Sequence, residues 1–313
     1  MVELDQPSNR LTISGRGREA RRMGRQRNKK GAPSKAEKGR PSRRGSSYRS
    51  GRLGVRFALA LLALSIPLAI GVAVLVMSRQ GASSEPEDLR AAIVDQLSLT
   101  EPNPDFAEEV TDMLEGAGYT VDYYPGEQVT VDFYRDLPEH GYDLIVLRNH
   151  AARRPDVLAS RLPDEAALFT SEAYDRDKYA EDQDALRLVK VRYPDSDEVF
   201  FGVRSDFITS SMKGRFDGTT IVLMGCNGLT TSRTAEAFVE KGAKAVVGWS
   251  ELVSASHTDE ATERLLEHLV VDGQTLEEAV EKTMADVGPD PAYGSVLRIY
   301  PPEAAASTIR QSS

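Results

Sequence analysis

Cysteine is almost absent from this chain, in which Cys226 is the single cysteine among 313 residues. One cysteine excludes an intramolecular disulfide, so a folded domain must be stabilised by its apolar core. The four histidines are scattered along the sequence, and together with one cysteine they give no pattern of metal ligands. We therefore expect no metal and no other cofactor.

Large apolar side chains are almost missing from residues 1–56, which carry 17 Lys and Arg against 4 Asp and Glu. Such a segment cannot bury enough apolar surface to offset the entropy lost on ordering it. We therefore predict a basic disordered tail at residues 1–56. Residues 303–313 are likewise expected to form a disordered C-terminal tail.

Charge is absent from residues 57–77, a run of 21 residues between Arg56 and Arg79. About 20 apolar residues span a bilayer as a helix, whereas the apolar part of a cleavable signal peptide has only about 7–15. We therefore predict a transmembrane helix that acts as a signal anchor, with a cleaved signal peptide as the alternative. Because the basic residues precede this run, the N-terminus is expected in the cytoplasm, with the basic tail against the anionic inner leaflet.

Basic residues are scarce in the remaining part, because residues 79–313 hold 22 Lys and Arg against 44 Asp and Glu. This part is expected outside the cytoplasm as a single-pass protein of the cell membrane. Its strong acidic balance argues against nucleic acid as a partner of the outer domain. A polar linker over residues 78–88 connects it to the predicted membrane helix.

The pattern of residues 89–302 alternates between strands and helices. Strands are expected at 91–94, 119–124, 142–147, 219–224, 245–249 and 295–300, with helices beginning at Asn103-Pro104 and covering 232–241, 265–269 and 276–284. Residues 129–137 fit a short helix or a loop. Residues 151–218 form an insertion that includes a β-hairpin from 186–193 and 198–203. The alternation predicts an α/β fold in which helices cover both faces of a mainly parallel sheet.

Cys226 and His150 each follow a buried apolar run, at 221–224 and 144–147. Ligands of open α/β sheets bind beyond the carboxyl ends of the strands, and neighbouring strands lie about 4.8 Å apart. If these two strands are adjacent, the imidazole can take the thiol proton, and the backbone N–H groups in Cys226-Asn227-Gly228 can bind an oxyanion. A core cysteine and a histidine bonded to backbone are the simpler alternative.

The sequence around Cys226 resembles the cysteine motif of the caspase-like superfamily, the clan CD peptidases. The runs VLMGCNGL at 222–229, GAKAVVGW at 242–249 and DGQTLEEAV at 272–280 carry the resemblance, which is strongest to CHAT and gingipain-type domains. It covers roughly residues 89–302 and implies a three-layer caspase-like (flavodoxin-like) fold. It also implies peptide-bond hydrolysis by a Cys–His dyad, with the family's histidine at the position of His150.

Two features differ from the family pattern. The family's histidine is usually followed by glycine, whose N–H helps to hold the oxyanion, and here Ala151 follows. The 76 positions between His150 and Cys226 exceed the roughly 50 of caspases, a difference that the insertion can absorb. The resemblance further implies a substrate pocket lined by Trp249, Ser250 and Glu251, in which Glu251 would favour a basic side chain.

The sequence thus predicts a membrane-anchored cysteine peptidase that hydrolyses a peptide or protein substrate, with Cys226 as nucleophile and His150 as base. A second interpretation is a catalytically inactive caspase-like domain that acts as a membrane-tethered sensor or interaction module. A third is a flavodoxin-like binding domain with a core cysteine. His257, expected near a helix start capped by Ser256 or Thr258, is a rival partner for the thiol.

Overall fold

The computed structural model describes residues 88–153, 163–193 and 196–309. The predicted basic tail at 1–56, the predicted membrane helix at 57–77 and all but the last residue of the linker at 78–88 lie outside these ranges. Within them, no helix has both the length and the apolar character needed to cross a membrane.

Within the described residues, six strands form the central sheet in the order β10-β9-β8-β3-β1-β2. All neighbours pair in parallel except β10, which runs antiparallel to β9. This confirms the mainly parallel sheet that the alternating pattern predicts. The strands are β1 (Leu89–Asp95), β2 (Tyr119–Pro125), β3 (Leu144–Arg148), β8 (Thr220–Leu223), β9 (Ala245–Trp249) and β10 (Leu297–Tyr300).

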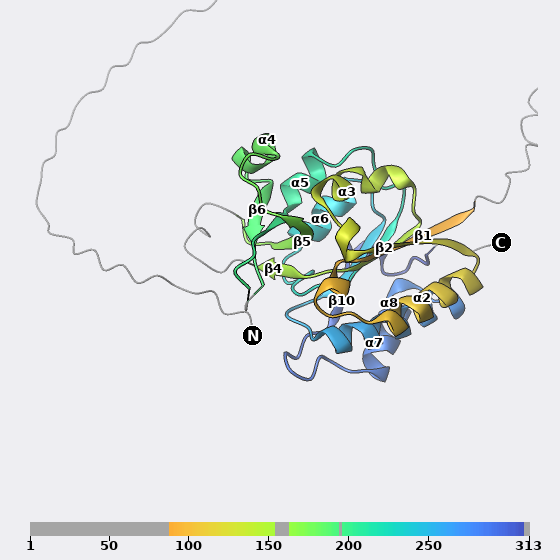
Figure 1. The fold of residues 1–313 in the computed structure, drawn as a ribbon. Coiled ribbons are helices and arrows are strands. Elements are labelled where there is room, and N and C mark those ends of the chain that lie inside the picture. The colour runs from red at the N-terminus through yellow and green to blue at the C-terminus, as the bar shows by residue number, and fades with distance from the viewer. Residues whose placement is uncertain (1–87, 154–162, 194–195, 310–313) are drawn as a thin grey trace, which may run out of the picture. The chain divides into compact units, whose positions relative to one another are not determined.

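Helices cover both faces of this sheet and give the domain its three layers (Figure 1). One layer contains α2 (Pro104–Gly116), α7 (Ala255–Leu266), the π-helical turn η5 (Glu267–Val271) and α8 (Leu276–Asp286), and the other contains α3 (Val131–Asp136), α5 (Ser205–Ser210) and α6 (Arg233–Glu240). Alternate residues of each strand face opposite layers. In β1, for example, Ile93 belongs to the apolar cluster that includes residues of α2, α7 and α8. Val94 belongs to the cluster that includes residues of α3, α5 and α6.

Local sequence signals account for several helix ends. Asn103 caps α2 by accepting a 3.2 Å hydrogen bond from the Phe106 N–H, and Pro104 occupies the first turn. Thr275 and Glu278 form a capping box at the start of α8. The undecided segment 129–137 contains α3, which Thr130 caps through a bond from the Phe133 N–H.

The insertion contains a second sheet, antiparallel throughout, with the strand order β4-β5-β7-β6. The predicted hairpin is present as the antiparallel pair β6 and β7. The sequence analysis missed the two strands and the two helices that accompany it. The parts of the insertion are β4 (Ala151–Arg153), β5 (Ala166–Ala173), α4 (Ala180–Asp184), β6 (Leu188–Val191), β7 (Phe200–Val203) and α5.

Short 3-10 turns connect several elements, namely η1 (Gln96–Leu99), η2 (Gly126–Gln128), η3 (Leu137–His140) and η6 (Pro302–Ala304). Residues 303–309, assigned from the sequence to a disordered tail, pack on the domain. Ile309 is only 3% exposed, and the Leu276 N–H donates to the Ser307 carbonyl over 2.9 Å. The folded domain therefore extends at least to Ile309, because this side chain completes the core beside α8.

Candidate functional site

The turns that carry His150 and Cys226 are in contact at the carboxyl edge of the sheet. Strands β3 and β8 are parallel neighbours, and Leu147 pairs with Leu223, so each candidate residue lies three positions beyond a paired residue. A Cβ atom built on Gly225 would lie 2.6 Å from the Asn149 carbonyl oxygen and 3.2 Å from the Ala151 Cβ. Gly225 is therefore required for the Cys226 turn to pack against both neighbours of His150.

Asn227 shapes the turn after Cys226 and does not offer a free amide. Its φ of 61° is left-handed, a conformation that asparagine tolerates better than most residues. Its N–H donates to the Glu251 carbonyl over 2.8 Å, and its side-chain oxygen accepts from the Thr230 hydroxyl at 3.1 Å. The expectation that the Asn227 amide binds an oxyanion is therefore wrong, because this donor already ties the turn to the segment after β9.

The Cys226 thiol is partly buried and donates a 3.5 Å hydrogen bond to the Val253 carbonyl. Burial raises its pKa, since the thiolate loses its hydration; the Val253 backbone opposes this effect and the charge of Asp290 adds to it. The side chain is therefore a neutral thiol at neutral pH.

The His150 imidazole is also neutral at neutral pH. Burial and the nearby positive charge of Arg148 lower its pKa to about 4. Its Nε2 lies 2.8 Å from the Thr100 hydroxyl, whereas the Cys226 thiol bonds to Val253. Within the described residues, the structure thus brings the two turns together but gives no hydrogen bond between thiol and imidazole.

A buried charge network is centred on Arg148, two residues before His150. The Arg148 guanidinium bonds Asp95 over 2.7 Å and Asp259 through two 2.8 Å contacts. It also donates to the Glu101 carbonyl at 2.8 Å. Burial opposes the charge of Arg148, but the two carboxylates outweigh it and raise its pKa. The sequence analysis missed this network, although a charged residue at the end of each apolar run, Asp95 and Arg148, was a usable signal.

The three residues predicted to line a substrate pocket have different environments. Trp249 is completely buried, and its indole N–H donates to the Thr258 hydroxyl over 2.8 Å. Ser250 is buried too, with its hydroxyl accepting from the Val296 N–H. Glu251 alone among the three is exposed to solvent. The side chain of Trp249 belongs to the core, so Glu251 is the one that remains available to a substrate.

His257 lies in the first turn of α7, close to where the sequence placed it. Its Nε2 is 3.2 Å from the Gly288 carbonyl, and its ring packs against Trp249 with 5.5 Å between centroids. The N-cap residue is Ser254 rather than Ser256 or Thr258. Thr258 instead donates to the Met224 carbonyl over 3.0 Å, which fastens α7 to the end of β8.

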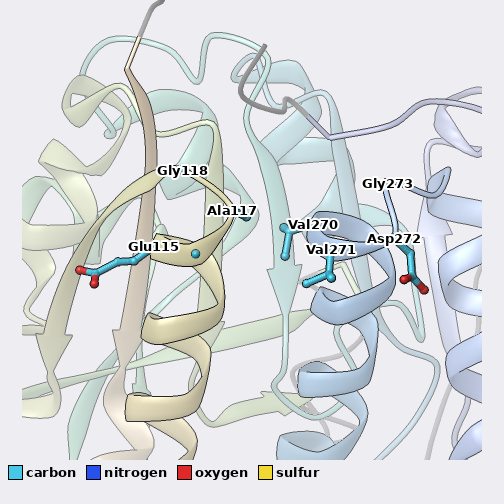
Figure 2. A pocket seen from close by; sticks show the side chains of 8 residues that line it. Glu115, Ala117, Gly118, Val270, Val271, Asp272 and Gly273 are labelled. Atoms are coloured by element: carbon cyan, nitrogen blue, oxygen red, sulfur yellow. The ribbon is translucent and has the colours of Figure 1, made fainter.

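A shallow surface pocket of about 450 Å³ lies between the end of α2 and the end of η5 (Figure 2). It is lined by Glu115, Gly116, Ala117, Gly118, Val270, Val271, Asp272 and Gly273. Since α2 returns from the carboxyl end of β1 to the amino end of β2, this pocket is at the opposite edge of the sheet from Cys226. Its chemistry is therefore separate from that of the candidate site.

The described residues hold no cluster of three or more His, Cys, Asp or Glu side chains arranged to bind a metal ion. His268 comes nearest to such a cluster, since its ring nitrogens lie 2.9 Å from Asp272 and 3.1 Å from Asp286. This arrangement joins His268 of η5 to the residue that follows η5 and to the last residue of α8.

No protein-family model matches the chain, and no curated protein is similar to it. Among solved structures, it is similar to the Arg-specific cysteine proteinase gingipain R (RGPB), with 12% identity, a TM-score of 0.41, and coverage of 74% of this chain and 50% of that one. It is also similar to protein GSU0716 from Geobacter sulfurreducens, with 10% identity, a TM-score of 0.36, and coverage of 71% and 99%. The chain thus spans half the length of the gingipain chain, and TM-scores below 0.5 leave the site to be judged on its own geometry.

The two pKa shifts predict how the thiol reacts with an alkylating reagent. Only the thiolate is reactive, so the alkylation rate of Cys226 should rise with pH in a single step whose midpoint is above the usual value of about 8.5. Because the pKa of His150 is about 4, its protonation is centred at that pH, and no second step is expected between pH 5 and 8. Iodoacetamide kinetics with mass spectrometry measure this profile, and a reactive plateau at pH 5–7 would contradict it.

Proposed function

We propose that this chain is a membrane-anchored cysteine peptidase of the caspase-like fold that hydrolyses peptide bonds with Cys226 and His150. The observation that carries the proposal is the contact of the Gly225 position with Asn149 and Ala151, the two neighbours of His150. This contact lies at the carboxyl edge of two adjacent parallel strands, where α/β folds bind their ligands. The domain would act outside the cytoplasm, held at the bilayer by residues 57–77, with the basic tail on the inner leaflet.

The chemistry begins from a neutral thiol and a neutral imidazole. A lowered pKa keeps His150 unprotonated and able to accept a proton at neutral pH. As the Cys226 sulfur forms a bond to the substrate carbonyl carbon, the thiol proton passes to His150. The C–N bond then breaks, the same proton goes to the leaving amine, and water hydrolyses the resulting thioester to regenerate the thiol.

Ala151 is the amide donor that best fits the developing oxyanion. The Phe169 N–H donates to the His150 carbonyl, which makes Ala151 and Leu168 a non-hydrogen-bonded pair of the β4–β5 ladder. In an antiparallel ladder, each residue of a non-hydrogen-bonded pair turns its N–H away from the partner strand. The Ala151 N–H therefore points off the outer edge of β4, and its Cβ is on the side of the Cys226 turn. Gly228 is the second candidate donor.

Glu251 supports a preference for a basic residue next to the cleaved bond. Its carboxylate is exposed, and its backbone carbonyl holds the Asn227 amide, so it lies beside the nucleophile's turn. A carboxylate in this position can bind the guanidinium or ammonium group of a substrate. We therefore propose peptides with Arg or Lys before the cleaved bond as the substrate class.

The single cysteine allows a clean chemical test of the mechanism. The full chain in detergent should cleave a mixed peptide pool, and mass spectrometry of the products should show cleavage after Arg or Lys. Alkylation of the one thiol should abolish this cleavage, because no second cysteine can take up the reagent. Cleavage that survives complete alkylation of Cys226 would rule out the thiol mechanism.

A catalytically inactive domain, acting as a membrane-tethered sensor or interaction module, is the second candidate. It is favoured by the bonds of the thiol to Val253 and of the imidazole to Thr100, and by a pair of pKa shifts that disfavours a thiolate–imidazolium pair. This function predicts no cleavage of the peptide pool under any condition. It also predicts that replacing His150 leaves the alkylation rate of Cys226 unchanged at every pH.

A further inference from the structure

Gln96 holds the backbone of His150 in place. This side chain lies in η1, directly after β1, and is completely buried. Its oxygen accepts a 2.9 Å hydrogen bond from the His150 N–H, and its amide nitrogen donates to the Tyr193 hydroxyl over 2.6 Å. Because both ends of the amide are bonded and the side chain is buried, its orientation is fixed.

Two aromatic rings of the insertion pack against the His150 ring. The Tyr193 ring meets it edge-on with 5.0 Å between centroids, and the Phe169 ring lies 5.7 Å away. The two aromatic rings stack on each other at 5.3 Å, and Phe169 is almost fully buried. The ring of His150 is therefore confined by residues that lie 19 and 43 positions further along the chain.

Thr100 binds the His150 ring at Nε2, over 2.8 Å. A hydroxyl can donate to an unprotonated ring nitrogen or accept from a protonated one, so the bond can persist before and after His150 gains a proton. A carboxylate in this place could only accept, and its charge would raise the pKa of the imidazole. With Nε2 bonded to Thr100, Nδ1 is the nitrogen that remains for the thiol proton.

We infer that Gln96, Thr100 and Tyr193 are positioning residues that fix the ring of His150 and direct its Nδ1 toward proton transfer. The inference rests on the proposed role of His150 as base. It also gives the insertion a role in catalysis, because Tyr193 belongs to the insertion. Gln96 binds the backbone N–H, Tyr193 packs against the ring, and Thr100 binds Nε2. The proposed role of His150 requires the tautomer in which Nε2–H donates to Thr100 and Nδ1 is unprotonated.

Thr100→Val tests the hydroxyl, because it keeps the shape of the side chain and removes the bond to Nε2. The full chain in detergent, labelled with ¹⁵N at its four histidines, should show one His150 tautomer in the parent and a mixture in the variant. The kcat should fall about five- to tenfold with KM unchanged, as expected for one lost hydrogen bond. Thr100→Ser should restore both readouts, and Thr111→Val, which removes a 2.7 Å bond on α2, should change neither.

Tyr193→Phe tests the link from the insertion, because it keeps the ring and removes the hydroxyl that Gln96 binds. The ¹⁵N signal of the His150 amide, which Gln96 accepts from, should move, and the kcat should fall about threefold or more. Tyr174→Phe is the matched control, since its hydroxyl makes an equally short 2.6 Å bond to Gln183 far from His150.

The outcomes separate this inference from the proposed function. Unchanged ring and amide signals in both Thr100→Val and Tyr193→Phe would overturn the positioning roles, even if the parent chain cleaves peptides. The predicted falls in kcat in these variants, together with the mixed tautomer in Thr100→Val and the moved amide signal in Tyr193→Phe, would support them. If the parent chain does not cleave peptides at all, the peptidase proposal fails, and the ¹⁵N spectra still decide whether Thr100 and Gln96 fix the ring.

Discussion

Replacing Cys226 by alanine is expected to abolish peptide cleavage while leaving the fold intact. The loss should be about 10⁴-fold or more in kcat, because the nucleophile of an acyl-transfer mechanism has no substitute. Stability should change by less than about 1 kcal/mol, since the thiol is only partly buried and its one bond, to Val253, is long and weak. Steady-state cleavage assays and thermal unfolding of the full chain measure the two quantities.

His150→Gln provides the second arm of this experiment. If Cys226 and His150 act as one unit, the double variant should be no slower than either single variant, because the dyad is already broken by one change. His257→Gln is the control for the rival histidine and should leave the kcat within a few-fold of the parent. Loss of cleavage in His257→Gln but not in His150→Gln would show that His257, and not His150, is the base.

Replacing Arg148 by methionine is expected to lower the free energy of unfolding by about 3–5 kcal/mol. The change removes the guanidinium that pairs with Asp95 and Asp259. Their carboxylates, which are only 1% and 4% exposed, then stay buried without a cation. The fluorescence of Trp249, the single tryptophan and part of the buried core, reports unfolding by denaturant. A loss below about 1 kcal/mol would contradict the assignment of a structural role to this network.

Two comparisons sharpen the Arg148 experiment. Arg264→Met removes an exposed ion pair with Glu267, for which a loss of at most about 1 kcal/mol is expected. Combining Arg148→Met with Asp95→Asn and Asp259→Asn should recover part of the lost stability, because no buried charge is then unpaired. In any Arg148→Met protein that remains folded, the midpoint for protonating His150 should rise from about 4, since Arg148 contributes to the lowering.

Much of the site could be predicted from the sequence, because the patterns that indicate it involve residues close together in the chain. An apolar run buried on both faces indicates a strand of a parallel sheet, and such runs end next to His150 and Cys226. Asn103 and the pair Thr275 and Glu278 mark helix starts, because a capping side chain acts within three or four residues of itself. These features depend on neighbours in the chain, so the alternating fold and the positions of the two candidate residues could be predicted.

Only the tertiary structure decided what surrounds those two residues. It made β3 and β8 neighbours, brought Thr100 and Tyr193 to the His150 ring, and used the Asn227 amide to bind Glu251. It also buried Trp249 and left Glu251 exposed, although only Ser250 separates the two in the sequence. The physical reason is that strand order, burial and hydrogen-bond partners are set by contacts between residues far apart in the chain. A pattern of neighbouring side chains places a thiol at a strand end, but it cannot say which group that thiol will meet.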